Sequence, residues 1–154
     1  MINQVGRLVG LVLVTGLSML GANSAHAQGT AQDEAAIRSL IRAEDNGERP
    51  PLTDDAVFAS GRTVVPLVGR EDIERFLDRE RLVRPAERPN ETRTTSIQFM
   101  VVSPAGDVAY ELSSFRREWD AQGGRSFVTG TQSRVWRKIN GQWRQAAVLA
   151  MTTP

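Results

Sequence analysis

Four strand-like runs in the second half of the chain constrain its fold most. Apolar and polar residues alternate with a period of two over residues 92–102, 108–119, 125–138 and 142–151. Turn-forming residues separate these runs. The last separator, Asn140-Gly141, is the strongest short hairpin signal, because both residues accept the positive φ of a type I′ turn. The pattern predicts an antiparallel meander of four strands.

The first half of the chain carries helical patterns instead. An amphipathic helix is expected over residues 31–46, and a second from Gly69 to the prolines at 85 and 89. Residues 56–60 and 64–68 read as short strands between them. Helices followed by a run of strands indicate an α+β domain.

The N-terminus has the layout of a secretory signal peptide. Arg7 precedes an apolar run over residues 8–20, and Ala25 and Ala27 are the small residues that a signal peptidase reads. The run falls short of the roughly 20 residues that cross a bilayer, so a retained anchor is the less favoured alternative. We expect cleavage after Ala27 and a periplasmic or secreted protein with no stable membrane anchor.

Cleavage would remove residues 1–27 and with them His26, the only histidine. The mature chain would have a short flexible terminus, 28–32, and a single domain over 33–151. It would contain neither histidine nor cysteine, which excludes thiolate nucleophiles, Ser-His-Asp triads and ordinary zinc or copper sites. We therefore expect no cofactor and no metal, and the composition leans against an enzyme.

Basic residues are almost all arginine, with Lys138 the only lysine. They alternate with acidic residues, as over 70–81, instead of forming the clustered patch that nucleic-acid binding requires. No nucleic-acid partner is expected.

Apolar residues on both faces of the strands bear on assembly. Ile97, Phe99 and Val101 alternate with Met100 and Val102. Such strands belong to a sheet that is covered on both sides. Helices can cover one face, and a second subunit is the expected cover of the other, giving a homodimer through the sheet.

Several segments together resemble the nuclear transport factor 2-like superfamily, in particular its SnoaL-like and ketosteroid-isomerase-like proteins. They are Asp54-Asp55-Ala56-Val57-Phe58, Val68-Gly69-Arg70-Glu71-Asp72-Ile73, Gly106-Asp107-Val108-Ala109-Tyr110 and the stretch Val135–Arg144. The resemblance implies a cone-shaped, curved antiparallel sheet, made of the four-strand meander and the short early strands, wrapped around N-terminal helices and enclosing an apolar pocket.

The residues that the resemblance would make catalytic are missing. The base position of the isomerases falls on Ser60, and the two oxyanion-donor positions fall on Leu40 and near Gln132. Serine is no base, leucine donates no hydrogen bond, and an amide is a weak substitute for a protonated aspartate. The segment 47–53 is also shorter than the second helix usual in the family, which bears on the closure of the pocket.

Strand alternation suggests which side chains face the pocket. If the concave face follows Gln132, then Arg134 lies on it, as do Phe58 and Ser60; with the opposite parity Arg134 is exposed. Glu111 is its candidate partner, or a weak candidate for a catalytic base. The other expected pocket residues are Leu40, Phe76, Tyr110 and Trp119.

Three functions stay open on these grounds. The first is an exported domain that binds a small, mostly apolar or weakly anionic molecule without the isomerase machinery. The second is a carboxylate-dependent isomerase, cyclase or hydrolase. The third is a structural dimerisation module with a vestigial pocket.

Overall fold

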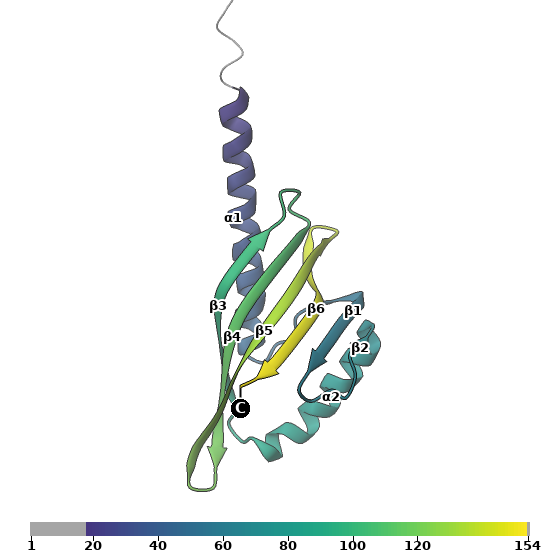
Figure 1. Cartoon of the computed structure of the whole chain (residues 1–154), viewed down its shortest axis with the longest axis vertical. Coiled ribbons are helices and arrows are strands. Elements are labelled where there is room, and N and C mark those ends of the chain that lie inside the picture. The colour runs from purple at the N-terminus through teal and green to yellow at the C-terminus, as the bar shows by residue number, and fades with distance from the viewer. Residues whose placement is uncertain (1–17, 154) are drawn as a thin grey trace, which may run out of the picture.

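The computed structural model describes residues 18–153, with side chains from Thr30 onward. The elements in chain order are α1 (Ser18–Asp45), β1 (Leu52–Ser60), β2 (Leu67–Val68), α2 (Arg70–Glu87), β3 (Thr92–Val102), β4 (Val108–Ala121), β5 (Gly124–Ile139) and β6 (Gln142–Thr152). They form an α+β domain in which the two helices cover a curved six-stranded sheet (Figure 1).

The sheet has the strand order β2-β1-β6-β5-β4-β3. The antiparallel meander β3–β6 confirms the sequence prediction, and Asn140 and Gly141 turn between β5 and β6 with φ values of 51° and 76°. β1, however, pairs with β6 in parallel, so the sheet is mixed and not wholly antiparallel. The parallel pair follows from the crossover connection through α2 and the meander, which returns the chain to β1 in the same direction.

Both helices lie on the same face of the sheet, which we call the interior face. Ile37 and Ile41 of α1 are buried against Trp136 and Trp143 of the meander. Ile73 of α2 is buried in a second cluster with Leu52 and Ala56 of β1, with Phe58 packed against it. Cross-strand partners point to the same side, and Phe58, Val148, Arg134 and Glu111 follow one another in register across four strands.

Two β-bulges in the meander change which residues share a face, and a further register shift lies between Leu52 and Val57, where β1 pairs with β6. The register shifts at Gln98 in β3 and at Ala146 in β6. A bulge inserts one extra residue and so inverts the alternation beyond it. Ile97 therefore packs on the core while Phe99 is 53% exposed, although a strict period of two places them on one face.

The predictions for the N-terminus fall partly on residues that the structure does not describe. Residues 1–17 are not described, nor are the side chains of Ala25 and Ala27, so cleavage stays a prediction. In the full chain α1 runs from Ser18 to Asp45 and includes the segment 28–32. The expected flexibility of that segment after cleavage stays a prediction. Among the described residues, no helix is long and apolar enough to span a membrane.

Candidate functional site

A buried ion pair lies at the centre of the interior face. Arg134 of β5 and Glu111 of β4 are register partners, and both side chains are fully buried with 3.2 Å between Nη1 and an Oε atom. The guanidinium also lies 3.1 Å from the carboxylate of Glu44 in the last turn of α1. Of the two parities that the sequence left open, the structure has the one with Arg134 inside.

The polar network continues toward β3 through Arg93. This side chain pairs with Glu44 and donates a 2.8 Å hydrogen bond to Gln132, whose amide in turn donates to the Ser113 hydroxyl at 3.1 Å. Asp45 accepts from the backbone and hydroxyl of Thr95. The end of α1 is thereby attached to the sheet by charged and polar contacts, not by apolar packing alone.

Burial and charge act in opposite directions on these groups. Burial lowers the pKa of Arg134, and the neighbouring Glu44 and Glu111 carboxylates counter part of that effect. Burial would raise the pKa of Glu44, but the guanidinium groups of Arg93 and Arg134 together outweigh it, so that the pKa lies below the ordinary 4.5. Both groups are therefore charged at neutral pH.

Glu44 makes stability depend on acidity. Because its pKa is lower in the folded chain, its contribution is fully present above about pH 4.5 and is lost as the pH falls through the folded-state pKa. The free energy of unfolding of Glu44→Gln, measured with urea from pH 7 down to pH 3, should therefore fall less steeply with acid than that of the wild type. An equal or steeper fall would contradict this assignment.

An open cavity of about 900 Å³ adjoins this network. Its walls come from the end of α1, the connection to β1, the C-terminal half of α2, the start of β3, and β4. Only six residues connect α1 to β1, and Asn46 to Pro50 of that connection form part of the wall. We call this cavity the arginine pocket after the six arginines that line it: Arg49, Arg81, Arg84, Arg88, Arg93 and Arg117.

Aromatic rings support the inner arginines. The ring centroid of Phe115 lies 5.7 Å from the guanidinium of Arg93 and 5.8 Å from that of Arg117, and the ring of Trp119 lies 4.4 Å from the guanidinium of Arg88. Arginine stacks on aromatic faces and is more weakly hydrated than lysine, so these cations tolerate partial burial. Burial and the nearby Arg93 charge lower the pKa of Arg117.

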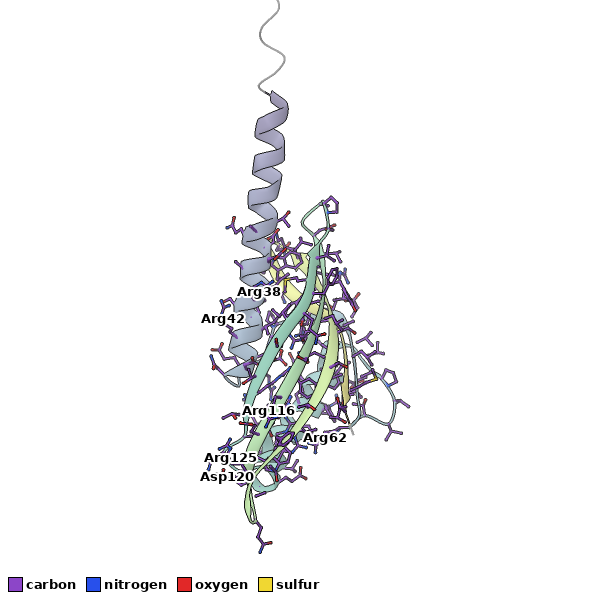
Figure 2. The ribbon with its side chains drawn as sticks, turned by 60° about the vertical axis from the view of Figure 1, so that its left-hand side comes forward. Arg38, Arg42, Arg62, Arg116, Asp120 and Arg125 are labelled. Carbon is purple, nitrogen blue, oxygen red and sulfur yellow. The ribbon has the colours of Figure 1, made fainter. Side chains whose placement is uncertain are left out.

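Arginines outside the pocket are dispersed. Arg38 and Arg42 lie along α1, whereas Arg116 and Arg125 lie on the β4–β5 hairpin (Figure 2). Several are paired locally, as Arg38 is with Glu34, Arg116 with Glu118 and Arg125 with Asp120. Exposed pairs of this kind contribute little to the stability of the fold, and each carries its own negative charge beside the arginine.

Most expected pocket residues lie on the interior side, but in its apolar clusters and not in the arginine pocket. Leu40 packs on the α1 cluster, and the rings of Phe58 and Phe76 are 5.7 Å apart in the α2 cluster. Ser60 takes part in the turn after β1, where its hydroxyl accepts from the backbone of Arg62. Gln132 and Arg134 lie just behind the pocket wall through their contacts with Arg93 and Glu44.

Tyr110 does not line a pocket on the interior face, contrary to the prediction from the sequence. It is the neighbour of Glu111 on β4, and adjacent strand residues point to opposite faces, so the two cannot share a pocket. Tyr110 is 40% exposed on the outer face, with its ring 6.3 Å from that of Phe99. Trp119 has the interior parity, and its contact with Arg88 places it beside the pocket.

Glu44 and the pocket arginines were not predicted from the sequence. Each lies in a segment where arginine and acidic residues alternate, which is the pattern of an ordinary solvated surface. No local signal distinguishes them, because convergence of α1, α2 and the strands brings them together. Among the described residues, no cluster of acidic or histidine side chains could hold a metal ion.

The architecture is that of the nuclear transport factor 2-like proteins, as the sequence resemblance implied. A nuclear transport factor 2-like protein with a cystatin-like fold from Novosphingobium aromaticivorans superposes with a TM-score of 0.66 at 17% identity, covering 89% of this chain and 90% of that one. A ketosteroid isomerase-like protein from Erwinia carotovora atroseptica gives 0.60 at 20% identity, covering 81% and 97%.

A hexachlorocyclohexane dehydrochlorinase gives a TM-score of 0.62 at 14% identity, covering 80% of this chain and 87% of that one. No protein-family model matches the sequence, and comparison with curated proteins finds no relative. At these identities the likeness defines the fold alone, and function has to be argued from the site.

Proposed function

We propose that the protein binds a small organic acid in the arginine pocket. One observation carries the proposal: an open cavity of about 900 Å³ has six arginines in its walls against five acidic side chains, with a buried charged network behind them. A volume in this range suits a ligand of drug-like size. Of the two ligand classes expected, mostly apolar or weakly anionic, this lining favours the anionic one, because guanidinium groups form bidentate contacts with carboxylates.

Binding is better supported than catalysis. Ketosteroid isomerase-like and dehydrochlorinase neighbours make an enzyme conceivable on this fold. Glu111, the candidate base, is fully buried against Arg134 and is not among the residues that line the arginine pocket. A base has to come within hydrogen-bond reach of the proton it abstracts, and such a position does not provide that reach.

Native mass spectrometry of the protein purified from its own source tests this function. We expect to find a bound organic acid. The Arg117→Gln variant should bind that acid about tenfold more weakly, because losing a charged contact of about 1.4 kcal/mol lowers the affinity tenfold. Arg75→Gln is the matched control, because Arg75 pairs with Glu71 and Asp72 on the exposed side of α2, away from the pocket lining. A consistently empty pocket, or an uncharged ligand, would contradict the proposal.

We also propose that the protein is exported and dimerises through the outer face of the sheet. Both helices lie on the interior face, which leaves half-exposed apolar side chains uncovered on the other: Val57, Phe99, Val101, Tyr110, Leu149 and Met151. A contiguous patch of this kind favours association. Sedimentation velocity should report a dimer, and a monomer would contradict the proposed dimerisation.

The proposed export is tested separately. N-terminal sequencing of the mature protein should begin at Gln28, and a chain that keeps His26 would contradict export with cleavage after Ala27.

A further inference from the structure

One carboxylate in the arginine pocket is surrounded by three guanidinium groups. Glu91 lies just before β3 and is mostly buried. One of its oxygens is 2.7 Å from Arg117 and 3.7 Å from Arg84, and the other is 4.0 Å from Arg88. We call Arg84, Arg88 and Arg117 the arginine triad.

Positive charge exceeds negative charge around this carboxylate. The other acidic group in contact is Glu80, which is shared between Arg84 and Arg62. One oxygen of Glu91 accepts no hydrogen bond, and Arg88 approaches it only to 4.0 Å while stacking on Trp119. The triad therefore has hydrogen-bond donors and positive charge that Glu91 alone does not satisfy.

The position of Glu91 allows its side chain to leave without breaking the sheet. It precedes the first residue of β3, Thr92, and follows Asn90, which has a φ of 55° and a side chain that bonds Asp120. No cross-strand register partner belongs to Glu91, whereas Thr92 pairs with Glu118. Turn residues of this kind move at lower cost than residues inside a ladder.

From this geometry we infer that Glu91 occupies the place of a ligand's anionic group. The arginine triad is the subsite for the carboxylate or sulfonate of an organic acid, and Glu91 is an internal competitor that the acid displaces. The inference rests on the proposed function and names its subsite. A ligand therefore binds only if its anionic group interacts with the arginine triad more favourably than the Glu91 carboxylate does.

A pair of fluorescent probes isolates the charge contribution. 1-Anilinonaphthalene-8-sulfonate carries an anionic sulfonate, and N-phenyl-1-naphthylamine has the same aromatic body without it. In the full chain, Glu91→Gln should bind the sulfonate about tenfold more tightly than the wild type, an effect of about 1.4 kcal/mol. Its affinity for the neutral probe should stay unchanged. Glu87→Gln is the control, because Glu87 pairs with Arg62 outside the pocket.

A second variant keeps the test decisive if Glu91→Gln folds poorly. Arg88→Gln should weaken binding of the sulfonate about tenfold, again with no change for the neutral probe. Equal changes for both probes, or no change in either variant, would overturn the inference. Sulfonate binding that Arg117→Gln weakens but Glu91→Gln leaves unchanged would overturn the competition by Glu91 and keep the proposed function. Failure of the wild type and both variants to bind the sulfonate would overturn both.

Discussion

Replacing Glu111 with leucine should lower the free energy of unfolding by about 3–5 kcal/mol, because a buried guanidinium loses its register partner. Arg134 is itself fully buried, so water cannot replace the lost carboxylate. Glu44 remains 3.1 Å away, but it already pairs with Arg93. Urea unfolding of the full chain at pH 7 measures the change.

A double variant shows whether the single variant loses stability because Arg134 lacks its ion-pair partner or because the packing is disturbed. Glu111→Leu with Arg134→Met removes both charges and should recover most of the lost stability, because an apolar pair of similar volume avoids the desolvation cost. As a control, Glu71→Gln breaks an exposed pair with Arg75 and should change stability by no more than about 0.5 kcal/mol. Stability of the single Glu111→Leu variant equal to that of the wild type would show that Arg134 is not confined to the interior.

The second large effect concerns Gly130 on β5. Its register partner on β4 is Phe115, whose ring covers the glycine. A Cβ at this position would lie 2.5 and 2.8 Å from two atoms of that ring, and closer still to the backbone oxygen of Met151. Gly130→Ala should therefore cost about 3 kcal/mol, since the strand has to move to relieve the overlap. Thermal unfolding measures the loss.

Gly61→Ala is the matched comparison. A Cβ at Gly61 meets only the Thr152 hydroxyl at 3.9 Å, which is an ordinary contact, so its effect should stay within about 0.5 kcal/mol. Because Phe115 also contacts Arg93 and Arg117, Gly130→Ala should disturb the pocket wall as well. Equal stability of the two alanine variants would contradict the close cover of Gly130 by the ring.

Periodicity predicted the strands of the meander to within two residues at each end, the end of α1 and the place of α2, whereas α1 begins at Ser18, well before the predicted residue 31. Those patterns are local, because side chains alternate along a strand and repeat along a helix whatever lies opposite. The bulges at Gln98 and Ala146 left no such signal, so the faces of Ile97 and Phe99 were assigned wrongly. Bulges depend on the pairing of two strands, which one strand's residues do not encode alone.

By itself, the sequence determined the order of elements, the α+β class and the resemblance to nuclear transport factor 2-like proteins. It left two strand parities open, and in one of them Arg134 lies inside with Glu111 as its candidate partner. Tertiary structure alone decided which parity holds and where the pocket lies. Arg93, Arg117 and Glu91 look like surface charges in the chain, and only the meeting of α1, α2, β3 and β4 places them around one cavity. Convergence of distant segments is a property of packing, because the energy that selects it comes from contacts far apart in sequence.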